Sequence, residues 1–184
     1  VRVLARVEKD GSVKFFSRKG KEFNTLNVIK AEIERLGIKD CVLDGEMCIV
    51  DINGDEDYKL MVSYIKRKDY TVPNPVFKVF DVLTLSEFDS GISTSLLTER
   101  VGSWYSKTVN SKTIDILSMQ LVTGSKHITH LIDQATDQGW EGIMIRNNCK
   151  YEGKRTRNLL KVKKMHDAEY RVVDAEFGPY RLSL

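Results

Sequence analysis

Two short strand-like segments follow each other at the start of the chain, and their closeness in sequence limits how they can pair. V-R-V-L-A-R-V and S-V-K-F-F-S lie on either side of Lys9-Asp10-Gly11. Apolar residues recur at about every second position, which is typical of a strand with one buried face. A connection this short joins antiparallel strands. The pattern therefore predicts a hairpin over residues 2–17.

Further helix-like and strand-like segments alternate along the chain. Helices are expected where apolar residues recur every three or four positions, at 26–36, 57–68, 96–104 and 128–135. Strands are expected at 41–50, 76–83, 116–122, 142–146, 159–163 and 170–177. Strands outnumber helices and are often neighbours in sequence. We therefore expect an α+β fold with two antiparallel sheets flanked by helices.

The composition fits one domain outside membranes. The 184 residues are 41% hydrophobic, which is enough for one core, and no apolar run is long enough to span a bilayer. No signal peptide is visible, and the three cysteines favour a reducing compartment. We expect a cytoplasmic protein, or a nuclear one if its source is eukaryotic. The chain begins with Val1 rather than Met, which suggests a fragment.

The stretch 140–164 concentrates positive charge. Glu141 is followed by one further acid, Glu152, and by eight cations: Arg146, Lys150, Lys154, Arg155, Arg157, Lys161, Lys163 and Lys164. A local excess of this kind favours binding of a polyanion. Within it, Lys161 and Lys163 alternate with apolar residues, so both ammonium groups are predicted to lie on one strand face. There they could hold one phosphate and offset charge that develops on it.

Two acid–glycine pairs lie at strand-like segments. In L-D-G-E, Asp44 and Glu46 share one predicted face and could bind Mg²⁺ or a ribose hydroxyl. The alternative is a strand edge with solvated acids. In E-G-I-M-I-R, Glu141 precedes a core strand, and the alternative is an ordinary loop. Because both pairs occur in one short domain, each could supply a carboxylate to a shared cation.

Three other segments are less specific. In F-K-V-F-D, Phe80 is predicted to share a face with Lys78 and could stack on a base, although such segments are more often ordinary core. S-R-K-G places Arg18 in a basic turn, which is otherwise a solvated hairpin end. Lys66-Arg67-Lys68 ends a predicted helix, where cations are favoured by the helix dipole, and a role with nucleic acid is also open.

Together these segments resemble the nucleotidyltransferase domain of ATP-dependent DNA ligases. S-R-K-G, L-D-G-E-M, F-K-V-F-D-V-L, E-G-I-M-I-R and L-L-K-V-K occur in that family's order over nearly the whole chain. The resemblance implies an ATP-grasp-like domain over residues 1–167, with a nucleotide-binding cleft between its two sheets, and the start of an OB-fold domain at 168–184. RNA ligases and mRNA capping enzymes are alternatives, and a non-catalytic nucleic-acid-binding module is a more distant one.

The resemblance also implies roles for individual residues. The nucleotide-binding residues would be Arg2, Arg18, Glu46, Phe80, Glu141, Lys161 and Lys163. Phe80 would stack on adenine, and Lys161 and Lys163 would grip the α-phosphate. Glu46 and Glu141 would hold Mg²⁺, and these two acids and the two lysines would be the catalytic residues of the chain.

The family's nucleophile is the lysine of a K-x-D-G-x-R motif, and Arg2 stands in the place of that motif's last residue. The lysine would therefore lie upstream of Val1, and the fragment alone is not expected to adenylate itself. Arg155 and Arg157 would contact DNA. The implied reaction uses ATP and Mg²⁺ to seal nicks in double-stranded DNA through a lysine–AMP intermediate and a DNA-adenylate. The implied protein is a monomer.

Overall fold

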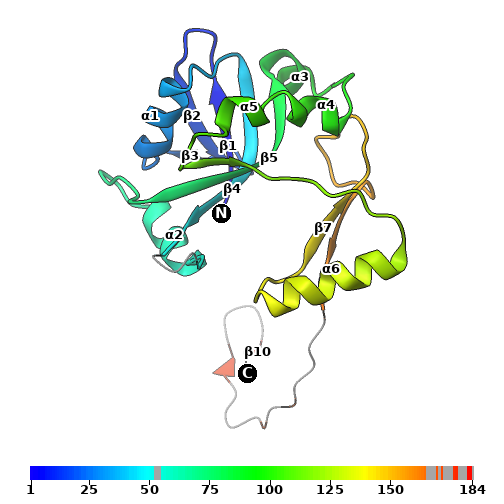
Figure 1. Ribbon diagram of the computed structural model, residues 1–184. Helices are drawn as coiled ribbons and strands as arrows, with labels where there is room; N and C mark the ends of the chain where they lie inside the picture. Colours follow the sequence, from blue (N-terminus) through cyan, green and yellow to red (C-terminus); the bar gives the residue numbers. More distant parts are fainter. Residues whose placement is uncertain (52–54, 165–168, 170, 172–175, 178–181, 184) are drawn as a thin grey trace. The chain divides into compact units, whose positions relative to one another are not determined.

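The computed structural model (Figure 1) describes residues 1–51, 55–164, 169, 171, 176–177 and 182–183. Contacts within the chain divide it into two compact units, which are described separately. The first comprises Val1–Leu121 and Arg146–Asn158, and the second comprises Val122–Ile145 and Leu159–Leu184. Every helix in the described parts is too short or too polar to cross a membrane.

The first unit is built on a six-stranded sheet. Its strands are β1 Arg2–Val7, β2 Val13–Ser17, β3 Glu22–Phe23, β4 Cys41–Ile49, β5 Pro75–Thr84 and β6 Ile114–Ile116. Their order is β3-β2-β1-β4-β5-β6. The predicted hairpin is confirmed by the antiparallel pairing of β1 with β2. The expectation of a purely antiparallel sheet is wrong at one edge, because β6 pairs parallel with β5. This strand also begins and ends earlier than the predicted 116–122.

The helices described in this unit are α1 Asn27–Arg35, α2 Tyr58–Ile65, α3 Leu85–Ser90, α4 Leu97–Gly102 and α5 Tyr105–Thr108. In α1, α2 and α4 the apolar period predicts a helix, and the prediction is confirmed. The sequence does not predict α3 and α5, since such short segments do not display the helical period. A local signal for α3 is nevertheless present, because Thr84 and Glu87 form a capping box at its start.

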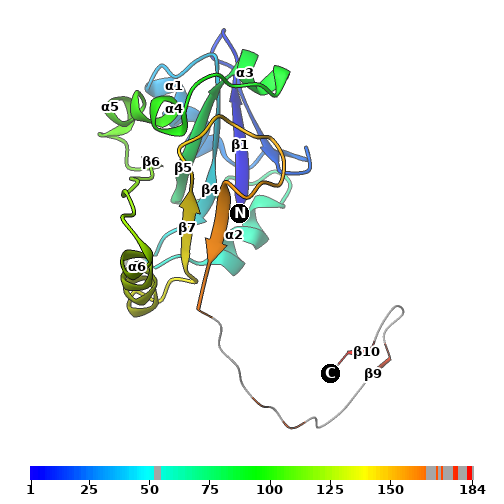
Figure 2. The ribbon, with the colours of Figure 1, turned by 90° about the vertical axis from the view of Figure 1, so that its right-hand side faces the viewer.

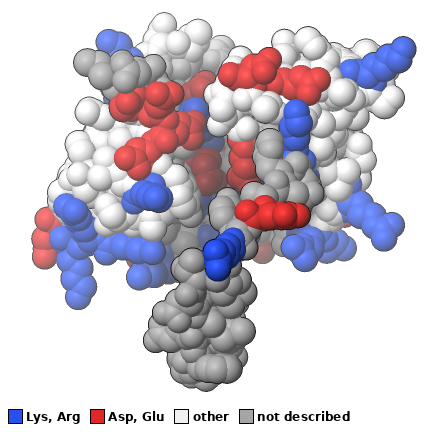
Figure 3. Space-filling view, turned by 90° about the horizontal axis from the view of Figure 1, so that it is seen from below, with Lys and Arg blue, Asp and Glu red and all other residues white. Residues whose placement is uncertain are grey.

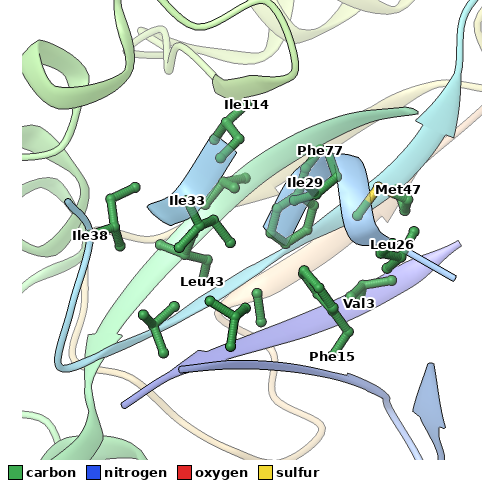
Figure 4. Packing of buried hydrophobic residues seen from close by; sticks show 14 of the residues in the cluster. Val3, Phe15, Leu26, Ile29, Ile33, Ile38, Leu43, Met47, Phe77 and Ile114 are labelled. Carbon is green, nitrogen blue, oxygen red and sulfur yellow. The ribbon is translucent and has the colours of Figure 1, made fainter. Parts of the chain in front are cut away.

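Apolar side chains of α1 and of the sheet form the core of the first unit (Figure 4). Ile29 and Ile33 of α1 are fully buried and belong to one cluster with Leu43 of β4 and Phe77 of β5. Every second residue of β1 is also buried in this cluster. Because one face of β1 is committed to the core, Arg2 lies on the other face.

The second unit contains α6 Ser125–Asp137 and most of a pair of strands, β7 Ile143–Arg146 and β8 Leu159–Val162, since the last residue of β7 is assigned to the first unit. Figure 2 shows the two strands next to each other. These three elements confirm the helix predicted at 128–135 and the strands predicted at 142–146 and 159–163. A second, antiparallel pair joins β9 Glu176–Phe177 and β10 Leu182–Ser183. Of the strand expected at 170–177, Arg171 is described and is not in a strand, whereas residues 170 and 172–175 lie outside the described residues. The expected domain boundary at 167–168 also falls on residues that are not described.

Candidate functional site

The glycine of L-D-G-E is explained by the neighbouring strand. A Cβ atom on Gly45 would lie 2.4 Å from the carbonyl oxygen of Lys78 and 2.9 Å from the Cα atom of Val79, both in β5. These distances are well below van der Waals contact. The glycine of β4 therefore permits the close approach of another backbone, and a ligand is not needed to account for it.

Phe80 is the extra residue of a β-bulge. The pairing of β4 with β5 shifts between Asp44 and Gly45, and this shift leaves Phe80 without an opposite residue. The Phe80 side chain is partly exposed, and the Cζ atoms of Arg2 and Arg146 lie 5.5 Å and 5.9 Å from its ring centroid. Bulges re-aim side chains and are frequent next to active sites. The bulge thus presents an aromatic ring beside two cations.

The alternation predicted for F-K-V-F-D is confirmed. Phe77 and Val79 are fully buried, whereas Lys78 and Phe80 are partly exposed. Lys78 forms an ion pair with Glu56. The ammonium group of Lys78 is therefore already engaged by a carboxylate.

The two acids of L-D-G-E have different surroundings. Asp44 is 1% exposed, and its two carboxylate oxygens accept hydrogen bonds from Arg2, at 3.0 Å from Nε and 2.6 Å from Nη2. Burial raises the pKa of the Asp44 carboxyl, and the Arg2 guanidinium opposes that rise. Glu46 is partly exposed, and its Oε1 lies 2.9 Å from the amino nitrogen of Val1. Asp44 thus holds Arg2, whereas Glu46 is accessible to a ligand or a cation.

A second buried carboxylate lies next to Phe80, and the sequence pattern alone assigns it no role. Asp81 is 1% exposed and accepts hydrogen bonds from Arg100 Nε and Nη2, at 2.9 and 3.0 Å, and from Arg146 Nη2, at 2.7 Å. Arg146 also donates from Nη1 to the carbonyl oxygen of Phe80, at 2.8 Å. The sequence signals are an Asp inside an apolar strand and an Arg beside the apolar face of a helix, but neither identifies its partner.

In the second unit, one carboxylate faces two ammonium groups. Lys161 Nζ donates to Glu141 Oε2 at 2.6 Å, and Lys163 Nζ donates to Oε1 at 3.4 Å. This common partner confirms that the two ammonium groups lie on the same side of the chain, with Lys161 in β8 and Lys163 directly after it. Their hydrogen bonds, that of Lys161 first, lower the pKa of Glu141. The Glu141 side chain is 64% exposed, so the cluster is open to a phosphate or to a metal ion.

Gly142 follows Glu141 because β8 leaves no room for a side chain. A Cβ atom on Gly142 would lie 2.2 Å from the carbonyl oxygen of Val162 and 2.8 Å from the Cα atom of Lys163. Its φ of 154° is also a conformation that favours glycine. The acid of this motif is therefore attached to a backbone that touches the strand of the two lysines.

The remaining predicted residues are exposed cations. Arg18 lies in the turn that follows β2, and Arg155 and Arg157 lie between β7 and β8. Figure 3 shows basic and acidic side chains interspersed on one face of the molecule. Among the described residues, no group of three His, Cys, Asp or Glu side chains is placed to hold a metal ion.

Six of the predicted site residues thus fall into two groups. Arg2 and Phe80 come together in the first unit. Glu46 lies in the same unit, in β4, the strand that also carries Asp44. Glu141, Lys161 and Lys163 come together in the second. That the two groups line one cleft stays a prediction.

The first unit thus presents an aromatic ring beside two cations, and the second presents two lysines that share one carboxylate. Residues 1–163 match the family described as the ATP dependent DNA ligase domain. The chain belongs to this family. No curated protein matches the sequence significantly.

Several solved structures are similar to the chain. Pmar-Lig_PreS3 is 30% identical, with a TM-score of 0.77 over 89% of this chain and 40% of that chain. The ATP-dependent DNA ligase from bacteriophage T7, in complex with ATP, is 19% identical, with a TM-score of 0.66 over 89% of this chain and 59% of that one. The ligase domain of LigD from M. tuberculosis is 21% identical, with a TM-score of 0.61 over 88% and 51%. The last two show a shared fold, and the chain spans less than two thirds of each of the three structures.

Proposed function

We propose that the chain is the nucleotide-binding part of an ATP-dependent DNA ligase that seals nicks in double-stranded DNA. Membership of the family supports this proposal. The observation that carries it is the accessible carboxylate of Glu141 between the ammonium groups of Lys161 and Lys163. Two fixed cations of this kind suit a reaction in which negative charge develops on a phosphoryl group.

The nucleotide would lie in an ATP-grasp-like cleft between the two sheets, with adenine on Phe80. Arg2 supports this placement, because Asp44 holds its guanidinium beside the ring. Glu46 would contact the ribose or water bound to the metal. Arg18 would touch the nucleotide or the 5′-phosphate of the nick.

The residues present fit a magnesium ion. Mg²⁺ usually takes one or two carboxylates and completes its coordination with water and substrate phosphates, so it needs no cage of protein ligands. Glu46 and Glu141 are both accessible carboxylates that could serve in this way. When bound, the ion would offset negative charge on the reacting phosphates.

The lysines would change partner during the reaction. Glu141 neutralises Lys161 and Lys163 in the structure. A nucleotide phosphate would replace Glu141 as their acceptor and would leave that carboxylate free for the cation. The two ammonium groups would then stabilise the α-phosphate in the transition state and, as nearby positive charges, lower the pKa of the attacking lysine.

The first step would use the lysine upstream of Val1. Its neutral amine would form a bond to the α-phosphorus of ATP and lose a proton to solvent. The bond between the α-phosphorus and the oxygen that bridges it to the β-phosphorus would break, so that pyrophosphate leaves with the electron pair. AMP would then pass to the 5′-phosphate of the nick, and the 3′-hydroxyl would displace it to join the strands. Arg155 and Arg157 would hold the DNA in these later steps.

Incubation of the full-length protein with ATP labelled at the α-phosphate tests the proposal. An acid-stable protein–AMP adduct is expected in the presence of Mg²⁺. Lys161→Ala should reduce its formation by about 10²-fold or more, the scale of losing one preorganised group that stabilises the transition state. Lys30→Ala is the matched control, because Lys30 is an exposed cation of α1.

Three results would contradict the proposal. Equal adduct formation by the two variants would remove Lys161 from the site, and labelling of the fragment itself would contradict an upstream nucleophile. Sealing of nicked RNA in place of nicked DNA would show that the substrate is wrong.

A further inference from the structure

A second basic surface lies at the end of α2, outside the residues assigned to the nucleotide. Lys66, Arg67 and Lys68 follow each other directly after α2, and all three are exposed. Within the described parts of the chain, none of the three is in an ion pair. We call residues 64–70 the α2 basic turn.

The central cation of this turn is held by two aromatic rings. The Cζ atom of Arg67 lies 4.4 Å from the ring centroid of Tyr64 and 4.8 Å from that of Tyr70. The two ring centroids are 5.1 Å apart, with an angle of 57° between the ring planes. Cation–π contact with two neighbouring rings restricts the guanidinium, although its N–H groups are still available to an acceptor. The Arg67 side chain therefore loses less conformational freedom when its guanidinium binds an acceptor.

The backbone of the turn is anchored to the core at both ends. At the start, the Thr25 hydroxyl donates to the carbonyl oxygen of Ile65 at 3.1 Å, and Thr25 and Ile65 are both buried. At the far end, the Val72 N–H donates to the carbonyl oxygen of Thr25 at 2.9 Å, and Val72 is fully buried. A single buried residue therefore fixes both ends. The three cations are therefore attached to a backbone that is anchored to the core at both ends.

The position of these cations at the end of α2 is partly explained by helix stability alone. Cations near a helix C-terminus are favoured by the dipole, an effect that falls off within the last turn. That effect requires neither three successive cations nor a guanidinium in contact with two rings. One acid, Asp69, interrupts the positive charge, and its φ of 48° is left-handed.

We propose that the α2 basic turn binds the phosphate backbone of the DNA substrate, independently of base sequence. The inference rests on the proposed function, since it assumes a duplex DNA substrate. Fixed cations beside aromatic rings suit phosphate oxygens, and Arg presents a planar set of donors to them. The turn would raise affinity for DNA and would take no part in the reaction with ATP.

Binding of a fluorescent nicked duplex to the full-length protein tests the proposal, with anisotropy measured over a series of salt concentrations. The variant replaces Lys66, Arg67 and Lys68 by Ala. A matched variant replaces three exposed lysines elsewhere, Lys9, Lys14 and Lys112. The slope of log affinity against log salt should become shallower by about 0.9 for each phosphate that the protein no longer neutralises, thus by about 2–3 for the first variant. The matched variant should keep the wild-type slope.

Arg67→Lys separates fixed geometry from charge. It keeps the positive charge and loses the planar set of guanidinium donors, so its affinity should fall between that of the wild type and that of the triple variant. All variants should form the protein–AMP adduct at the wild-type rate, which also shows that they are folded.

The two proposals fail differently. If the wild-type protein does not bind nicked DNA, the proposed function is wrong. If it binds and the two triple variants have equal slopes, the α2 basic turn does not bind DNA. A reduced rate of adduct formation in the first variant would also overturn the inference, because it would place the turn in the reaction with ATP.

Discussion

Replacement of Asp81 by Asn should destabilise the protein strongly. The Asp81 side chain is 1% exposed, and that of its partner Arg100 is 3% exposed. Asn keeps the shape but removes the negative charge, and its amide nitrogen would meet a guanidinium where a carboxylate oxygen accepted hydrogen bonds. Removing one partner of a buried ion pair costs about 3–5 kcal/mol, because the other charge stays buried without compensation.

The other hydrogen bonds of Arg100 place the expected loss toward the lower end of this range. Arg100 Nη1 still donates to the carbonyl oxygens of Ser95 at 2.7 Å and Cys149 at 3.2 Å. Arg146, the third member of the network, is more exposed and can turn toward solvent. We therefore expect a decrease of about 3 kcal/mol in the free energy of unfolding.

Urea unfolding measures this decrease. At an m-value of about 2 kcal/mol/M, a decrease of about 3 kcal/mol lowers the midpoint by about 1.5 M. Asp89→Asn is the matched control. Asp89 also binds one arginine through both oxygens, Arg6 at 2.5 and 3.0 Å, but its side chain is 53% exposed. Solvent screening makes exposed pairs weak, so its midpoint should scarcely change. Equal midpoints for the two variants would refute the reasoning from burial.

Two further predictions concern β4 and the cysteines. Gly45→Ala should lower the free energy of unfolding by at least about 1–3 kcal/mol, because its Cβ would collide with the backbone of β5, and an unchanged urea midpoint would contradict the close approach. Burial raises the pKa of Cys41 and of Cys48 to about 12, so both thiols should stay protonated and unreactive toward a thiol reagent in the folded protein between pH 7 and pH 9. Cys149 is partly exposed, so one fast-reacting thiol per chain is expected, and Cys149→Ser should abolish that phase. More than one fast phase in folded protein would show that the buried thiols are accessible.

Periodic features of the sequence were predictable, and long-range pairings were not. The hairpin of β1 and β2 and the shared face of Lys161 and Lys163 follow from alternation over a few residues, and the structure confirms both. The partners of Asp81 lie 19 and 65 positions away. Alternation states which face a residue occupies, but not which distant side chain meets it.

The bulge at Phe80 is a second feature that alternation cannot predict. It depends on the register of β4 against β5, in which Gly45 lies opposite Val79 and Phe80 has no partner. Gly45 is a usable signal in the sequence, because a glycine inside an apolar strand often marks the close approach of a ligand or of another backbone. The structure distinguishes the two, since the neighbouring atoms belong to β5.

Two buried carboxylates each hold an arginine beside the same aromatic ring. A contribution to folding stability is a weak explanation for why these acids are buried there. Asp44 and Asp81 lie opposite each other in β4 and β5, and each holds an arginine whose Cζ atom is within 6 Å of the Phe80 centroid. Apolar residues of similar volume often stabilise a core as well as a buried ion pair does. A positional role accounts for the acids better, because Arg2 and Arg146 would otherwise be free to turn into solvent. If Phe80 is the adenine platform that we propose, the two carboxylates fix the positive charge around it before the nucleotide binds.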